Sequence, residues 1–188
     1  ISLSLHLVFY GNPGTGKTTV SRLIAKIYKS LGVLSKGQLV ETDRGGLVGG
    51  YVGQTAIKTQ EMIDKAMGGI LFIDEAYALT HGKGENDFGQ EAVDTILKAM
   101  EDHRDNFIVI VAGYPELMKG FIASNPGLKS RFNQYINFED YTPTELKDIF
   151  LLYCKNQNLI LGESCDEYLM HHFQDLYDNR SEDYANGR

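Results

Sequence analysis

Residues 11–18, with the sequence GNPGTGKT, have the GxxxxGK[ST] spacing of a phosphate-binding loop. The glycines allow the backbone to wrap a polyphosphate with its N–H groups turned inward, and a helix that begins near Gly16 presents its positive end to the same anion. The Lys17 ammonium is then placed for the β and γ phosphates, and the Thr18 hydroxyl for a Mg²⁺ ion that bridges them. The pattern therefore predicts a nucleoside triphosphate site.

Residues 70–75, ILFIDE, predict the second part of this site, because two acids follow a run of apolar residues typical of a buried strand. Asp74 at the strand end is expected to hold Mg²⁺ together with Thr18, and Glu75 to polarise a water for attack on the γ phosphate. The alternative for Glu75 is a surface acid that starts a helix. The residues expected to bind the nucleotide are Asn12, Pro13, Gly14, Thr15, Gly16, Lys17, Thr18, Thr19 and Asp74.

The loop by itself would also fit a small-molecule kinase or a GTPase. The sequence contains no NKxD motif of the kind that reads guanine. A phosphotransferase lid would need basic residues, whereas residues 141–188 hold 4 basic and 9 acidic residues and so carry a net charge of −5. Two adjacent acids instead favour nucleotide hydrolysis.

The chain has 188 residues, of which 43% are apolar and 23% charged, and its net charge is −7. These values exclude a disordered or collagen-like chain. No apolar run approaches the roughly 18 residues of a membrane span, and no signal-peptide pattern occurs. An acidic surface repels phosphate backbones and anionic lipids, so we expect neither nucleic acid nor a membrane as a partner. With only Cys154 and Cys165 present, we expect a reducing cytoplasm.

Short apolar runs alternate with longer helical patterns, which predicts an α/β fold with a parallel five-stranded sheet flanked by helices. The expected strands are residues 6–10, 38–42, 69–74, 107–112 and 135–138. The expected helices are residues 20–31, 55–67 and 115–123, with another that follows Asp87, and residues 124–129 are interpreted as a loop.

After Asp140 the pattern is helical only. Thr142, Pro143 and Glu145 have the order of a helix cap, an N1 proline and an N3 glutamate, and a second helix is predicted from Ser164. We therefore predict a nucleotide-binding core over residues 1–140 and a partial helical lid over residues 141–188.

Several stretches together resemble the AAA+ ATPases, and within them the CbxX/CfqX group. They are GNPGTGKTT (11–19), LVGGYVGQTAIKT (47–59), GGILFIDEAYAL (68–79), FGQEAVDTILKAMED (88–102), IVIVAGY (108–114) and NPGLKSRF (125–132). The resemblance implies the P-loop fold with sheet order 5-1-4-3-2, ATP and Mg²⁺ as cofactors, and a protein client. It also implies a homo-oligomeric ring, most often a hexamer, with ATP between neighbouring subunits.

The same resemblance assigns further residues. Arg131 matches an arginine finger that reaches the ATP of the adjacent subunit, although spacing alone would favour an ordinary surface arginine. Tyr51, Val52 and Gly53 match a pore loop that grips the client, and a tyrosine folded back onto the sheet is the alternative.

Two positions are matched less closely. Tyr114 stands where most AAA+ proteins place a polar sensor, and sensing and packing are both open for its phenol. Arg188 matches the start of the helix that carries a second sensor arginine in the lid, and the resemblance places it among the nucleotide-binding residues. The function expected from these residues is ATP-driven remodelling of a protein by a ring. An ATP-dependent switch or assembly scaffold with little turnover is the alternative.

Overall fold

The computed structural model describes residues 4–51, 53–80, 88–162, 165–181 and 184–187. Its contacts divide the chain into two compact units. The sheet unit comprises Ile1–Tyr10 and Lys17–Asn137, and the C-terminal unit comprises Gly11–Gly16 and Phe138–Arg188. The glycine-rich loop thus packs with the C-terminal residues. Within the described ranges, no helix has the length and apolar character needed to cross a bilayer.

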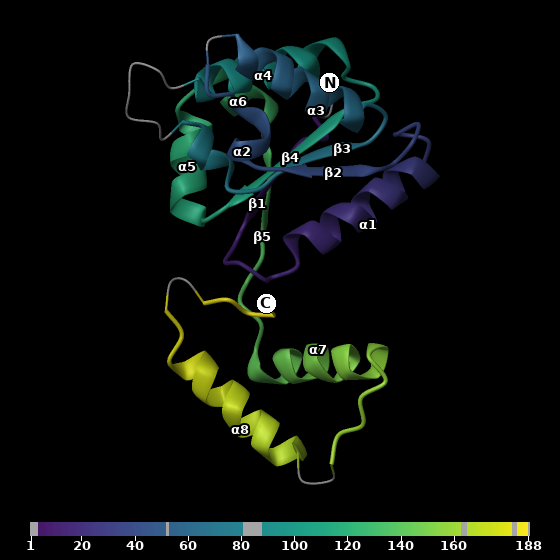
Figure 1. Cartoon of the computed structure of the whole chain (residues 1–188), viewed down its shortest axis with the longest axis vertical. Helices are drawn as coiled ribbons and strands as arrows, with labels where there is room; N and C mark the ends of the chain where they lie inside the picture. Colours follow the sequence, from purple (N-terminus) through teal and green to yellow (C-terminus); the bar gives the residue numbers. More distant parts are fainter. Residues whose placement is uncertain (1–3, 52, 81–87, 163–164, 182–183, 188) are drawn as a thin grey trace. The chain divides into compact units, whose positions relative to one another are not determined.

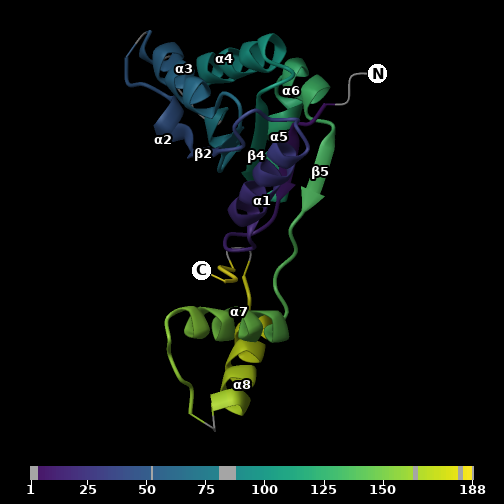
Figure 2. The ribbon, with the colours of Figure 1, turned by 90° about the vertical axis from the view of Figure 1, so that its right-hand side faces the viewer.

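A five-stranded parallel sheet forms the centre of the sheet unit, with strand order β2-β3-β4-β1-β5. Figures 1 and 2 show β2 and β5 at its two edges. The strands are β1 (Leu7–Tyr10), β2 (Leu39–Thr42), β3 (Ile70–Ile73), β4 (Ile108–Gly113) and β5 (Gln134–Asn137). Both the fold class and the strand order predicted from the sequence are confirmed.

The two central strands β3 and β4 are buried along their whole length, because helices cover both faces of the sheet. Alternate strand residues such as Leu71 and Val109 pack into one apolar cluster with α3 (Gln54–Ala66), α4 (Gly89–Asp102) and α5 (Pro115–Ala123). Figure 1 shows α1 (Lys17–Ser30) on the opposite face of the sheet. The carboxyl ends of the strands, where the predicted site residues lie, are therefore held by a packed core.

The short helix α6 (Pro126–Arg131) corrects the prediction of a loop over residues 124–129. The Asn125 side chain accepts a hydrogen bond from the Gly127 N–H at 2.7 Å, and Pro126 occupies the first helical turn. Six residues are too few to show a helical period, so only the cap could have revealed it. The structure adds α2 (Arg44–Leu47) and the 3-10 turn η1 (Ala76–Leu79), while Asp87 lies outside the described residues.

The His6 ring is buried beside β4, and its Nδ1 accepts a hydrogen bond from the Val109 N–H at 3.0 Å. Burial, with the positive charge of Arg131, lowers the pKa of His6 from 6.5 to about 4. As the pH falls from about 6.5 to about 4, the unfolded chain therefore binds a proton that the folded chain does not. The free energy of unfolding should drop by about 2 kcal/mol between pH 7 and pH 5 from this group.

Urea unfolding at the two pH values measures this effect when the chain is compared with the His6→Gln variant. We expect the variant to lack this part of the drop, since Gln does not titrate. An equal drop in both proteins would exclude His6 as its source.

The C-terminal unit contains two helices, α7 (Pro143–Asn156) and α8 (Cys165–Asp178), and the predicted cap of α7 is confirmed. The Thr142 hydroxyl accepts from the Glu145 N–H, and the Glu145 carboxylate accepts from the Thr142 N–H at 2.8 Å, which lowers the pKa of Glu145. The Phe150 and Phe173 rings meet edge-on at 6.2 Å between the helices. Ser164, where the second helix was expected to begin, lies outside the described residues.

Candidate active site

The glycine-rich loop follows β1 and leads into α1, as the sequence predicts. Gly11, Gly14 and Gly16 have φ values of 145°, 71° and 91°, which L side chains rarely adopt. At Gly11 a Cβ would also lie 2.3 Å from the Phe138 carbonyl oxygen. The Thr15 side chain is buried, and its hydroxyl donates to the Asn12 carbonyl at 2.9 Å. The loop is thus a tight, internally bonded turn that only glycine permits at these positions.

Helix α1 begins at Lys17, directly after the loop. Lys17 is only 9% exposed, Thr18 is partly buried, and Thr19 is exposed. The Ser21 hydroxyl donates to the Lys17 carbonyl at 2.9 Å, one turn along the helix. A lysine at the start of a helix adds its charge to the helix's own positive end, which favours an anionic ligand.

The end of β3 places the two predicted acids. The Asp74 N–H donates to the Thr42 carbonyl at 2.9 Å, which continues the ladder with β2, and one Asp74 carboxylate oxygen accepts from the Glu75 N–H at 3.1 Å. Glu75 has a left-handed backbone with φ of 48°, and its side chain is exposed. The turn directs two successive carboxylates differently, one held at the strand end and the other in solvent.

Thr18 and Asp74 line the same hollow of the sheet unit, whose volume is about 350 Å³. Its other oxygen-bearing residues are Glu41, Thr42 and Asp43 at the end of β2. Mg²⁺ prefers oxygen ligands, and it commonly takes only one or two protein ligands beside water and phosphate. In the part of the chain that the structure describes, no three His, Cys, Asp or Glu side chains gather as a metal cage. The residues present therefore fit a magnesium ion that arrives with a nucleotide.

Two tyrosines lie beside the acids. The Tyr77 and Tyr114 rings are 6.4 Å apart at 45°, and Tyr114 precedes α5 as its N-cap residue without a side-chain cap bond. Burial and the charges of Glu75, Tyr114 and Asp74 raise the pKa of Tyr77 to about 12. Tyr77 therefore keeps its proton at neutral pH and remains a hydrogen-bond donor next to the site. Tyr77 was not predicted from the sequence, although its position two residues after Glu75 was a usable signal.

Arg131 ends α6, and its guanidinium is held within the same chain. It donates to a Glu101 carboxylate oxygen at 2.9 Å and to the Gly127 carbonyl at 3.4 Å, with 28% of the side chain exposed. Glu101, near the end of α4, also pairs with Arg104. One carboxylate therefore fixes two arginines, and this cluster keeps a net positive charge.

Tyr51 is 74% exposed, so the alternative in which it folds back onto the sheet is wrong. Gly53, with φ of 79°, is the N-cap residue of α3. Val52 and Arg188, which the sequence analysis assigned to the pore loop and the second sensor, lie outside the described residues.

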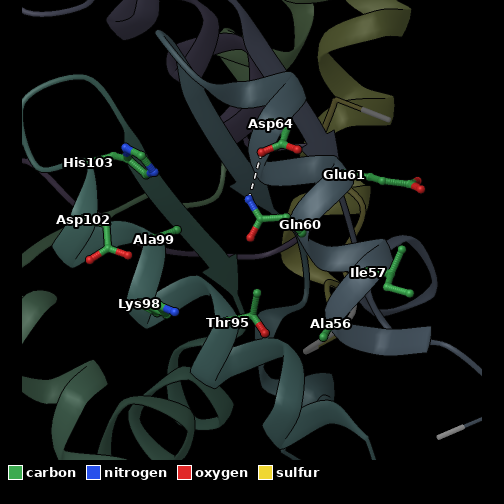
Figure 3. A pocket seen from close by; sticks show the side chains of 10 residues that line it. All are labelled: Ala56, Ile57, Gln60, Glu61, Asp64, Thr95, Lys98, Ala99, Asp102 and His103. Atoms are coloured by element: carbon green, nitrogen blue, oxygen red, sulfur yellow. Dashed lines mark hydrogen bonds between the residues drawn. The ribbon is translucent and has the colours of Figure 1, made fainter. Parts of the chain in front are cut away.

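Another hollow, of about 660 Å³, lies between α3 and α4 (Figure 3). Its charged side chains are Glu61, Asp64, Lys98 and Asp102, and the Gln60 amide donates to Asp64 at 2.8 Å. No residue predicted for the nucleotide site lines it, and we assign it no role.

Comparison with known proteins finds relatives along most of the chain. Stage V sporulation protein K of Bacillus subtilis (strain 168) is 57% identical over 146 residues, which cover 78% of this chain and 45% of that protein. Chromosomal protein CbxX of Cupriavidus necator is 51% identical over 146 residues, covering 78% and 46%. The chloroplastic ribulose bisphosphate carboxylase/oxygenase activase of Cyanidioschyzon merolae is 45% identical over 170 residues, covering 90% and 58%.

These matches confirm the resemblance to the CbxX group, and the chain spans about half the length of the curated relatives it matches. Among solved structures, the FIGL-1 AAA domain in complex with ADP aligns with a TM-score of 0.65 at 16% identity, covering 95% of this chain and 56% of that one. This likeness shows the fold alone. Residues 7–140 match the family described as ATPase family associated with various cellular activities (AAA), and the chain therefore belongs to the AAA family of ATPases.

Proposed function

We propose that this chain binds and hydrolyses Mg-ATP and, as one subunit of a homo-oligomeric ring, remodels a protein client. Membership of an ATPase family supports the reaction. The observation that carries the proposal is the hollow that Thr18 and Asp74 share in the sheet unit, because it places a hydroxyl and a carboxylate at the head of α1. Those are the two oxygen ligands that Mg-nucleotide chemistry needs from a protein of this kind.

Each residue has a separate task in this reaction. The backbone N–H groups of residues 14–16 and the Lys17 ammonium bind the phosphates, and Thr18 and Asp74 would hold the metal. A metal ion bound there would supply positive charge that offsets the negative charge of the phosphates. The Glu75 carboxylate, exposed next to Asp74, accepts a proton from the water that attacks the γ phosphate in line. The bond from the γ phosphorus to the β,γ-bridging oxygen breaks, and ADP leaves with that oxygen.

Arg131 is proposed to complete the site of the adjacent subunit. A guanidinium stabilises the charge that develops on the transferring phosphoryl group, and this effect is largest in the transition state. Within its own chain Glu101 holds Arg131 in one orientation. We infer that this ion pair presents the arginine at a defined place on the subunit surface before a neighbour arrives.

Mixing two inactive variants tests both the reaction and the assembly. Arg131→Ala keeps its phosphate loop and Lys17→Ala keeps its arginine. An interface is therefore complete when the first variant supplies the loop and the second supplies the arginine. In randomly mixed rings about one interface in four is of this type, so we expect about a quarter of the wild-type ATPase rate per subunit. The wild-type rate per subunit should also rise with protein concentration.

The Lys129→Ala variant is the matched control, because Lys129 is an exposed cation on the same helix α6. It should retain the wild-type rate alone. A mixture that stays inactive, while wild type hydrolyses ATP at every concentration, would contradict an arginine acting between subunits. ATP binding without turnover at any concentration would instead support the switch or scaffold.

The proposal also includes a protein as the client that the ATPase remodels. One relative is named as an activase of ribulose bisphosphate carboxylase/oxygenase, and the enzyme that it activates is itself a protein. The exposed Tyr51 offers apolar area at the entry to α3, where a loop tyrosine could press against an extended polypeptide. Both cysteines are free thiols, in keeping with the cytoplasmic setting that we propose.

A further inference from the structure

Asp140 lies between β5 and α7 and gathers hydrogen bonds within the C-terminal unit. One carboxylate oxygen accepts from the Asn12 amide at 2.9 Å and from the Asn186 amide at 2.8 Å, and the other lies 3.5 Å from the Arg180 guanidinium. Its side chain is only 20% exposed. A carboxylate withdrawn from water to this extent is stable only because several donors satisfy it.

Asn186 links this carboxylate to the loop backbone. Its amide oxygen accepts from the Tyr141 N–H at 2.8 Å, so both ends of the side chain are used and its orientation is fixed. Three consecutive loop carbonyls then accept hydrogen bonds from the C-terminal residues: Pro13 from the Asn186 amide at 3.3 Å, Gly14 from the Gly187 N–H at 3.3 Å, and Thr15 from the Tyr141 hydroxyl at 3.0 Å.

The direction of these carbonyls determines the direction of the loop amides. In a trans peptide the C=O and the N–H of the same unit point in opposite directions, and the structure contains no cis peptide bond among the residues it describes. Holding the carbonyls of residues 13–15 on one side therefore turns the N–H groups of residues 14–16 to the other. Those N–H groups are the donors that a phosphate loop offers to a polyphosphate.

We propose that Asp140, Tyr141 and Asn186 are positioning residues that aim the phosphate-binding N–H groups of the loop by anchoring its carbonyls. The inference rests on the proposed function, since it concerns how the same loop binds ATP. Asp140 carries a negative charge close to the loop, which would repel phosphate. Its role is therefore the alignment of Asn12 and Asn186 through hydrogen bonds. This alignment raises the affinity of the loop for phosphate, whereas the charge of Asp140 alone would lower it.

Two substitutions separate alignment from charge. Tyr141→Phe removes only the hydroxyl that bonds to Thr15, and it should weaken binding by about 3- to 10-fold. Asp140→Ala removes the repelling charge together with the oxygen that accepts hydrogen bonds from Asn12 and Asn186. We expect it to weaken binding by about 10- to 100-fold, whereas a purely electrostatic role predicts tighter binding.

Calorimetric titration with inorganic tripolyphosphate and with Mg-ATP measures both affinities on the full chain. Because the loop amides face the phosphates, each variant should lose the same factor with both ligands. The matched controls are Tyr153→Phe and Asp148→Ala, which change exposed side chains on α7. They should bind like the wild type, and thermal unfolding without ligand reports on the integrity of each variant.

The outcomes are distinct. If wild type binds tripolyphosphate, equal binding by Tyr141→Phe overturns the inference alone. Tighter binding by Asp140→Ala overturns it as well. A loss with Mg-ATP but not with tripolyphosphate also overturns it, because the effect would then lie outside the phosphates. Wild type that binds neither ligand overturns the proposed function and this inference with it.

Discussion

Replacing Lys17 by alanine is expected to abolish ATP binding at micromolar concentrations. Lys17 is nearly buried at the first position of α1, so a phosphate bound there meets its ammonium in a partly desolvated place. Truncating one partner of such a charge pair costs about 2–5 kcal/mol, which is roughly 30-fold to several thousand-fold in Kd. Calorimetric titration with Mg-ATP measures the change.

Lys26→Ala is the control for this variant, since Lys26 is an exposed lysine on the same helix. It should bind Mg-ATP within about twofold of the wild type, as expected for a surface cation. An unchanged affinity in Lys17→Ala, with the control also unchanged, would show that the loop does not hold the phosphates.

Replacing Glu75 by glutamine should separate binding from turnover. The amide has nearly the same shape but cannot take a proton from water, so the rate of hydrolysis should fall by about 10² to 10³-fold. The Kd for Mg-ATP should stay within about threefold, because Glu75 is exposed and is not assigned to the phosphates or the metal. Phosphate release at saturating Mg-ATP measures the rate, and calorimetric titration with Mg-ATP measures the Kd.

Glu61→Gln on α3 is the matched control, because it makes the same change at another exposed glutamate. Turnover close to the wild-type rate in Glu75→Gln would remove Glu75 from the mechanism. Loss of ATP affinity instead of turnover would move it among the binding residues.

The order of the strands and of the longer helices could be predicted because each of these elements carries its own local signal. Apolar runs such as residues 70–73 predict buried strands, and the Thr142 cap predicts the start of α7. A helical period predicts α1, yet Leu23 and Ile27 on it are more than half exposed while the smaller Ser21 and Ala25 are buried. Spacing reveals that a helix forms, but its buried face depends on packing partners that are distant in sequence.

The residues of the candidate site also differ in whether a local sequence pattern predicts them. The loop, Asp74 and Glu75 are contiguous motifs whose chemistry follows from residue type. Asp140 and Asn186 contact loop residues that are more than 120 positions away in the sequence, so no local pattern could predict them. The predicted domain boundary at residue 140 stays a prediction, while the contacts group Gly11–Gly16 with the C-terminal unit.

The left-handed backbone of Glu75 has a consequence for anyone who would engineer this protein. A residue with a Cβ is held in that conformation at a cost of about 1 kcal/mol, which Glu75→Gly would relieve. Screens that reward heat tolerance alone would therefore favour loss of the carboxylate proposed to activate water. Directed evolution of this chain needs an activity assay in every round, because at this turn thermal stability favours glycine and catalysis favours glutamate.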